Sequence, residues 1–489
     1  MPMNWRNCTS TICTTNMVRS IAQKEFLSTL RDKRFVVLSV LVLLLLLAAT
    51  VVGLYSAHTL QQERMVAQEE VNHQFHNSQD RHPHRMAHYG SFAFRPKSSL
   101  SFLDFGLDSF TGASVFMEAH RQNSANFSQA QQSSSLIRFG EMTVAFVLQM
   151  LLPLLIVFLC FGAFTQEKET GTLKILLSQG VSLRRIAWAK IKGYSKTVAL
   201  VVTPALLLAA GLLFGQNGFD LHPDTVWRLL LFLSFYLVYF FIFIVLSVII
   251  SALHRRSSTA LVTLLGIWIL FCVIIPKAAA NLGNTLYTTP TKAQMDADVH
   301  EEVAKGIDGH NAQDARAGGL KKELLRKYGV DSLSQLPVNV DGIIMAAGEE
   351  QSTRVYREHF DKLTNTFQQQ NLISELAAFL NPYLAVRHLS MGMAGSDFSH
   401  YLHFQEEAEE YRYKLAQGLN HLQATRLTYK DKTTRLSSDT WKEFKPFSYE
   451  TPPVQWALSH HVFSLAALFL WLVLVCTVGF RLIDKTQIV

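Results

Sequence analysis

The sequence is poor in charged residues. Asp, Glu, Lys and Arg make up 17% of its 489 residues, whereas hydrophobic residues make up 49% and phenylalanine alone accounts for 33. This balance is unlike that of a soluble globular protein of the same length, so it argues against an ordinary soluble enzyme. It favours a membrane protein with sizeable aqueous parts.

Motifs of nucleotide hydrolysis and of the common hydrolases are also missing. The sequence has no Gly-x-x-x-x-Gly-Lys-Ser/Thr, so this chain has no P-loop with which to hydrolyse ATP. His300-Glu301-Glu302 begins like a zinc-protease motif, but Ala304 stands where the second histidine ligand belongs. No Gly-x-Ser-x-Gly is present either. We therefore expect no catalytic residue and no cofactor in this chain.

Cysteine is scarce in the parts of the chain that face water. The sequence has five cysteines, and none falls in the two long polar segments, residues 56–143 and 277–461. These segments therefore cannot be held together by disulfides.

Six runs of apolar residues are each long enough to cross ~30 Å of hydrocarbon as a helix. They span residues 35–55, 144–164, 197–214, 229–251, 259–275 and 462–480, with the third to fifth inside 194–276. Two contain a proline, Pro153 and Pro204, which neighbouring helices can accommodate by satisfying the freed carbonyl groups. The runs hold essentially no acidic or basic residue, which disfavours an ion-coupled carrier. We predict an all-α polytopic membrane protein with six transmembrane helices.

The N-terminal residues fall into two parts. Residues 1–16 are polar and lack the apolar core of a secretory signal, so we predict a disordered tail; a true start at Met17 is the alternative. Residues 17–34 alternate apolar and basic side chains, which predicts an amphipathic helix at the membrane surface. The alternative is a plain extension of the first span.

The distribution of Lys and Arg predicts the orientation. Six lie in residues 165–193, and the N-terminal segment and the tail 481–489 are also basic, whereas the short loop 215–225 has none. Because basic loops stay in the cytoplasm, we expect both termini and residues 165–193 there. The polar segments then face outside and form a mainly helical extracytoplasmic domain built from two insertions, the first being loop-like at its start.

The first polar segment is rich in histidine. Five lie within 16 residues: His73, His76, His82, His84 and His88. Imidazoles at this density can hold zinc, copper or nickel. The alternative is an exposed polar loop that happens to be rich in histidine, so these residues are weak metal candidates.

The segment after the second span carries a recognisable pattern. Glu167-Lys168-Glu169-Thr170-Gly171-Thr172-Leu173 is followed by Leu176-Leu177-Ser178, Ser182 and Lys190. This pattern resembles the type-2 (ABC-2) family of ABC exporter permeases, although Gln179-Gly180 stands where that family often has proline. Asn381-Pro382-Tyr383 and Glu118-Ala119-His120 are similar to a bacterial subgroup with large extracytoplasmic insertions and no assigned substrate.

The resemblance implies how the chain works. Residues 165–193 would contain the coupling helix that inserts into a groove of an ATPase, with the coupling residues Glu167, Lys168, Glu169, Gly171, Thr172 and Leu173. Glu167 and Glu169 would pair with basic residues of that partner, Gly171 would allow close approach, and Leu173 would anchor in an apolar groove or in the membrane surface. Composition alone leaves open an ordinary amphipathic hairpin at the membrane surface.

The resemblance also implies the partners. They are two ABC ATPase subunits that bind ATP and magnesium, a second copy of the chain or a paralogous permease, membrane lipid and a periplasmic partner, but no nucleic acid. The expected location of the protein is the bacterial inner (cytoplasmic) membrane. Two other functions stay open: a mechanotransmission subunit without a substrate path, and a membrane scaffold or receptor that uses no ATP.

Overall fold

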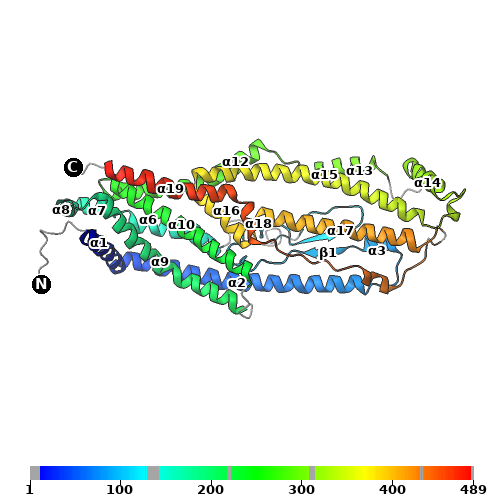
Figure 1. Cartoon of the computed structure of the whole chain (residues 1–489), viewed down its shortest axis with the longest axis horizontal. Coiled ribbons are helices and arrows are strands. Elements are labelled where there is room, and N and C mark those ends of the chain that lie inside the picture. The colour runs from blue at the N-terminus through cyan, green and yellow to red at the C-terminus, as the bar shows by residue number, and fades with distance from the viewer. Residues whose placement is uncertain are drawn as a thin grey trace.

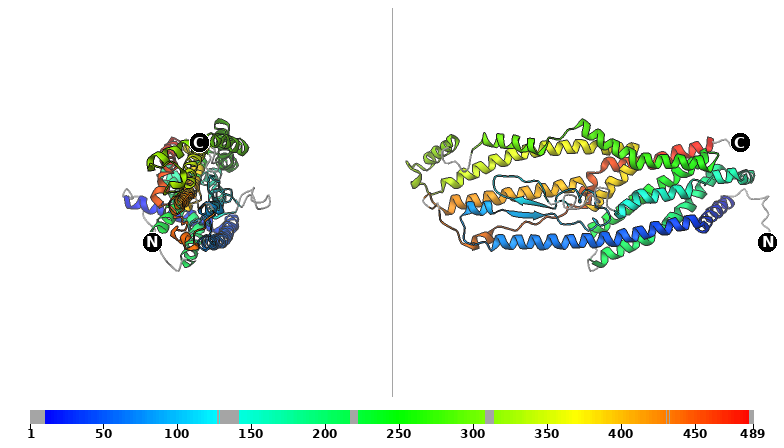
Figure 2. Two further views of the ribbon diagram at one scale, coloured as in Figure 1. Left: turned by 90° about the vertical axis from the view of Figure 1, so that its right-hand side faces the viewer. Right: turned by 180° about the vertical axis from the view of Figure 1, so that it is seen from behind.

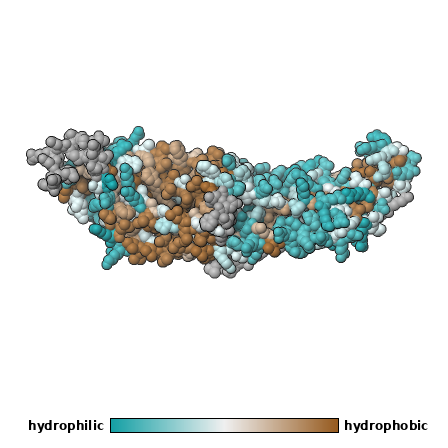
Figure 3. All heavy atoms as spheres, turned by 60° about the horizontal axis from the view of Figure 1, so that its bottom comes forward, coloured by the Kyte–Doolittle hydropathy of each residue, from teal (hydrophilic) through white to brown (hydrophobic). Residues whose placement is uncertain are grey.

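The computed structural model describes residues 11–126, 128, 142–216, 222–307, 314–429, 431 and 433–485. The molecule is elongated, with helices running along its length (Figure 1). One half has an apolar surface and the other a polar one (Figure 3). We call the polar half, made of the end of α2 and most of residues 77–126 and 287–450, the polar lobe.

Six helices among the described residues are long and apolar enough to cross a membrane, as predicted. They are α2 (Lys33–His76); α5 (Val144–Phe146), η3 (Val147–Leu151) and α6 (Leu152–Cys160) in sequence; α9 (Leu183–Gln216); α10 (Pro223–Leu253); α11 (Ser257–Ile269), η4 (Leu270–Ile274) and α12 (Ile275–Leu286) in sequence; and α19 (Val462–Lys485).

A turn of π-helix, η3, lies just before Pro153 in the second span. Proline has no N–H to donate to the carbonyl group four residues earlier, which is that of Gln149. The Tyr239 hydroxyl of α10 donates to this oxygen at 2.9 Å instead. A neighbouring helix therefore compensates for Pro153, as expected.

The N-terminal helix α1 (Thr11–Arg31) begins earlier than predicted. Residues 11–16, which we expected to be disordered, are helical, and residues 1–10 lie outside the described residues. Asp32 separates α1 from α2 and accepts a hydrogen bond from the Arg34 N–H at 2.9 Å. Beyond this break α1 turns away from α2 (Figure 2) and packs against α9.

The first polar segment is not loop-like at its start. α2 continues as a helix to His76, well past the predicted end of the span at residue 55. The reason is local: Gln61, Glu63, Arg64, Met65 and Ala67 are all good helix formers, and the region has no glycine or proline.

The polar lobe is mainly helical, as predicted. The first insertion adds α3 (Pro83–Tyr89) and two strands, β1 (Ser91–Phe94) and β2 (Ser114–Met117), which pair antiparallel with Ser91 opposite Met117. The second adds α13 (Lys292–Ala304), α14 (Ala315–Tyr328), η5 (Leu333–Gln335), α15 (Val340–Ala377), η6 (Ala378–Leu380), α16 (Pro382–Ala394), α17 (Phe398–Arg426), η7 (Ser438–Glu443) and α18 (Val454–Ser459).

The two insertions share one core. Phe75 and Met86 of the first pack with Leu419 and Trp441 of the second, and the Trp441 side chain is fully buried. Burying a large aromatic side chain contributes roughly 2–3 kcal/mol by area. The insertions therefore form a single lobe and not two separate ones.

A buried arginine adds a polar link between the insertions. Arg412 of α17 donates to both carboxylate oxygens of Glu409, to Glu349 of α15 and to the Glu118 carbonyl oxygen. Burial alone would raise the pKa of Glu349, but the hydrogen bond from His120 and the charge of Arg412 hold it at about 2. Glu349 is therefore a carboxylate at neutral pH.

Candidate functional site

The segment between the second and third spans folds into two short helices joined by a glycine. α7 (Thr165–Glu169) is followed by Thr170 and Gly171, and α8 (Thr172–Ser178) leads to a turn at Gly180. Gly171 has a φ of 76°, a left-handed conformation that glycine adopts without strain. We call residues 165–178 the elbow.

The Glu167 carboxylate joins the elbow to two other helices. Its Oε1 accepts hydrogen bonds from Lys190 Nζ of α9 at 2.9 Å and from Lys24 Nζ of α1 at 3.2 Å. Lys190 also donates to Glu25 Oε1 at 2.9 Å, and the Tyr194 hydroxyl donates to Glu25 Oε2 at 3.1 Å. We call Lys24, Glu25, Glu167 and Lys190 the charge cluster.

The charge cluster is largely withdrawn from water. Lys190 is 1% exposed, and Glu25 and Glu167 are buried. Burial alone would raise the pKa of Glu25, but the charge and hydrogen bond of Lys190 bring it below its ordinary value. Because buried ions are tolerated only with opposite charges and hydrogen bonds around them, the cluster fixes the relative positions of α1, α7 and α9.

Lys168 and Glu169 bind the ends of two further helices. Lys168 Nζ donates to the Ala252 and His254 carbonyl oxygens at the end of α10. The Glu169 carboxylate accepts from the N–H of Ser257 at 2.7 Å and from its hydroxyl at 2.9 Å, at the start of α11. A cation at a helix C-terminus and an anion at an N-terminus are both favoured by the helix dipole.

The outer face of the elbow is exposed. Thr170, Gly171, Thr172 and Lys174 are all exposed, and Ile175 is 60% exposed. Ile175 of α8 and its exposed polar neighbours together form a surface that a partner could contact.

The structure shows what the predicted coupling residues contact within the chain. Glu167 accepts a hydrogen bond from Lys190, and Glu169, although exposed, accepts one from Ser257. A Cβ added at Gly171 would meet nothing within 4 Å in this chain, so within the chain the glycine is needed for its backbone conformation. Leu173 is 1% exposed and anchors α8 in the core of this chain.

Sequence reasoning missed Lys24, Glu25, Tyr194 and Ser257, because each is far in sequence from the residue it binds. One signal was available. Glu25 is the only acidic residue between Met17 and Arg31, in a helix that is otherwise basic. Such a lone acidic residue is a candidate for an ion pair with a lysine or arginine of another helix.

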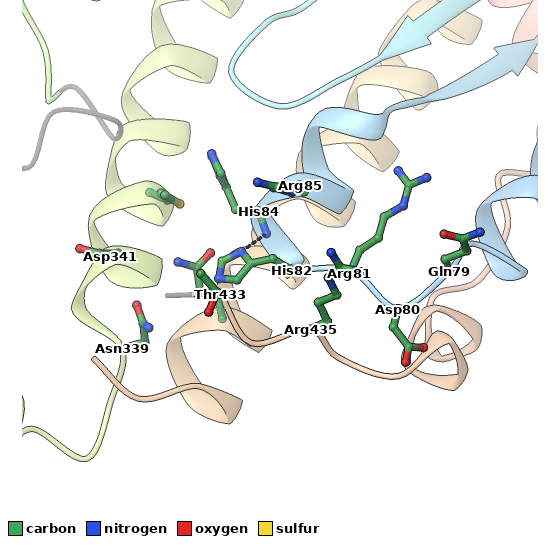
Figure 4. Close-up of a pocket in the computed structure, with 12 residues that line it drawn as sticks. Gln79, Asp80, Arg81, His82, His84, Arg85, Asn339, Asp341, Thr433 and Arg435 are labelled. Atoms are coloured by element: carbon green, nitrogen blue, oxygen red, sulfur yellow. Dashed lines mark hydrogen bonds between the residues drawn. The ribbon is translucent and has the colours of Figure 1, made fainter. Parts of the chain in front are cut away.

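The structure separates the five predicted histidines. His76 Nε2 contacts the Phe444 carbonyl oxygen at 2.8 Å, and His73 is exposed on α2. His82 precedes α3, with its ring turned back onto the backbone: its Nδ1 accepts from the His84 N–H at 3.3 Å, in the wall of a cavity of about 570 Å³ (Figure 4). Only His84 and His88 lie together, and His120 from beyond β2 joins them.

Two protein-family models match the chain. Residues 111–276 match the ABC-2 family transporter protein, and residues 292–450 match a domain of unknown function (DUF3526). A comparison with curated proteins finds no match. The first match contains the elbow and the spans on either side of it, and the second covers most of the second insertion. As the resemblance predicted, residues 111–276 of this multi-pass membrane protein match the ABC-2 family of transporter proteins, and this match supports an ABC-2 type permease, the membrane subunit of an ABC transporter.

Proposed function

We propose that this permease belongs to an ATP-driven exporter of a bacterial inner membrane, in which the elbow receives the movement of a separate ATPase subunit. The main observation in support of the proposal is that three consecutive residues of the elbow each contact different helices. Glu167 binds α1 and α9, Lys168 binds the end of α10, and Glu169 binds the start of α11. A force on α8 is therefore passed to four helices at once.

The exposed face of the elbow would contact the ATPase, and its buried face would attach it to the rest of the permease. The surface around Thr170, Lys174 and Ile175 would dock in a groove of the ATPase, whereas Leu173 and Glu167 hold the elbow to the permease. Rigid attachment matters, because a loosely held α8 would move alone and leave the spans in place.

The proposed orientation follows from charge. α1, the elbow and the end of α19 lie at one end of the molecule, opposite the polar lobe (Figure 1). The basic residues of these segments support a cytoplasmic position for that end, where ATP is available. The polar lobe would then be periplasmic, and free to meet a periplasmic partner.

The proposed assembly contains two permease chains, either two copies or a pair of paralogues, and two ATPase subunits that hold ATP and magnesium. Exposed apolar side chains such as Val37, Leu207 and Phe469 would face lipid or the second permease. The chain itself would contribute no catalytic group.

The experiment is to replace the exposed apolar residue of α8. Ile175→Asp should abolish copurification of the ATPase and substrate-stimulated ATP hydrolysis, while the chain still inserts into the membrane. Leu286→Asp is the matched control: Leu286 is 57% exposed against 60% for Ile175, but lies at the opposite end of the fifth span. Normal coupling in Ile175→Asp would overturn the proposal.

A second function, mechanotransmission, is favoured by the length of α2. This helix runs unbroken from the membrane region into the polar lobe (Figure 2), and its 44 residues span about 66 Å at the rise of an α-helix. Such a helix would move the polar lobe without any substrate crossing between the spans. Export of a substrate into sealed inverted vesicles would favour the first function, and ATP-dependent rearrangement of the lobe without export would favour the second.

A further inference from the structure

Three histidines from separate parts of the first insertion meet in the polar lobe. His84 and His88 lie four residues apart on α3 and therefore share one face of that helix. His120 lies beyond β2, and the three ligand atoms lie within 4.8 Å of one another. The ring centroids of His84 and His88 are 4.6 Å apart, and those of His88 and His120 are 5.3 Å apart.

The backbone at His120 is held in an unusual conformation. Its φ is 64°, and it is the only non-glycine residue with positive φ in the part of the chain that the structure describes. Such conformations are uncommon for residues with a Cβ and concentrate at sites where the side chain must be placed. Here the conformation directs the imidazole toward α3.

A buried carboxylate orients the His120 ring. Glu349 Oε2 lies 3.0 Å from His120 Nδ1 and also accepts a hydrogen bond from the His120 backbone N–H at 2.7 Å. The Glu349 side chain is fully buried and is held in turn by Arg412. With Nδ1 turned to the carboxylate, Nε2 is the ring nitrogen that would coordinate an ion. Metal-binding histidines characteristically donate a hydrogen bond from their other ring N–H to such a carboxylate.

We propose that His84, His88 and His120 bind a divalent late transition-metal ion, of the class of Zn²⁺, Cu²⁺ and Ni²⁺, with Glu349 as the positioning residue. Imidazole nitrogen suits these ions, whereas Mg²⁺ and Ca²⁺ prefer oxygen. Metal–nitrogen bonds of about 2.1 Å in tetrahedral geometry put ligand atoms about 3.4 Å apart. The observed spacing needs only a small closure of side chains, two of which are partly buried and one exposed.

The ion would be bound by three histidines of the first insertion, and the contact between His120 and Glu349 would link the site to the second insertion. α3 and the turn after β2 would be clamped together, and Glu349 would carry the clamp to α15, the long helix of the second insertion. The site depends on the polar lobe alone, so it does not rest on the proposed ATPase coupling.

The test uses the full-length chain in detergent, stripped with a chelator and titrated with Zn²⁺ and with Cu²⁺ by calorimetry. We expect one ion per chain with micromolar or tighter affinity, and Cu²⁺ should show nitrogen coupling in its electron paramagnetic resonance spectrum. His88→Ala changes an exposed residue and should weaken binding at least tenfold without altering the melting temperature of the metal-free protein. Glu349→Gln should weaken it about tenfold or more while keeping nitrogen ligation.

His73→Ala is the matched control, since His73 is an exposed histidine of the same insertion but lies on α2 outside the cluster. Its binding curve should match the unmodified protein. Absence of stoichiometric binding at micromolar metal, unchanged binding in His88→Ala, or loss of binding in His73→Ala would overturn the proposal.

Discussion

Lys190 Nζ of α9 lies 2.9 Å from Glu167 Oε1 of α7, with both side chains buried. This contact joins the elbow to the third span, α9, just after the end of the second span. The same nitrogen lies 2.9 Å from Glu25 Oε1, so one lysine holds two carboxylates from two other helices.

Removing the Lys190 charge should destabilise the protein strongly. Lys190→Met leaves Glu25 and Glu167 buried beside the single exposed amine of Lys24, and loss of one member of a buried ionic group costs about 3–5 kcal/mol. Thermal unfolding in detergent should show a clearly lowered midpoint. Lys192→Met, an exposed lysine two residues away, should leave it unchanged. Adding Glu25→Gln and Glu167→Gln to Lys190→Met should recover part of the loss.

Replacing Glu169 should disconnect α7 from the fifth span without unfolding the chain. Glu169→Ala removes both hydrogen bonds to Ser257, so we expect normal membrane insertion but loss of substrate-stimulated ATP hydrolysis in the assembled transporter. Glu301→Ala, an exposed glutamate of the polar lobe, is the control and should behave normally. Unchanged stimulation in Glu169→Ala would show that the contact with α11 is not needed for coupling.

A side chain at Gly193 should force α1 away from α9. A Cβ there would lie 2.8 Å from the Ala22 carbonyl oxygen and 2.9 Å from Glu25 Cβ, both in α1. Gly193→Val should therefore expose α1 to limited proteolysis and lower the melting temperature. Gly211→Val lies on the same helix with no atom within 4 Å of the new Cβ, so it should show neither effect. Equal protease sensitivity in the two variants would contradict the contact.

The polar lobe should lose stability in acid through Asp108. Burial alone would raise the pKa of this carboxyl group, but Arg95 and Lys97 beside it hold it at about 2, below the ordinary 3.8. A carboxyl group with a lowered pKa stabilises the fold above about pH 4, and this contribution of about 2 kcal/mol is lost as the pH falls toward 2. Unfolding midpoints of the unmodified protein and Asp108→Asn, measured across this range, should converge at low pH. Parallel curves would assign the acid sensitivity to other groups.

Local patterns were enough to predict the spans and the position of the elbow. Hydropathy over about 20 residues reflects burial in lipid directly, and the elbow follows from its helix formers and from Gly171. The predicted loop after residue 55 was wrong because the residues that follow, although polar, favour a helix. The polarity of a segment distinguishes residues that face water from residues that lie in lipid, but it does not distinguish a helix from a loop.

Pairings across the sequence were not predictable in the same way. Glu25 meets Lys190 across 165 residues, and His120 meets Glu349 across 229. No periodicity links such positions, because tertiary packing brings them together. The histidine-rich stretch showed the same limit: sequence density grouped five residues, whereas the fold keeps two of them and adds a third from elsewhere.

The charge cluster has equal numbers of cationic and anionic groups. Lys24 and Lys190 carry two positive charges and Glu25 and Glu167 two negative ones, so the group as a whole is neutral. Moving a net charge through the membrane potential requires work of about 2.3 kcal/mol per 100 mV, but a neutral group requires none. The cluster can therefore move as one unit with α1, the elbow and the third span without drawing on, or being opposed by, the voltage across the membrane.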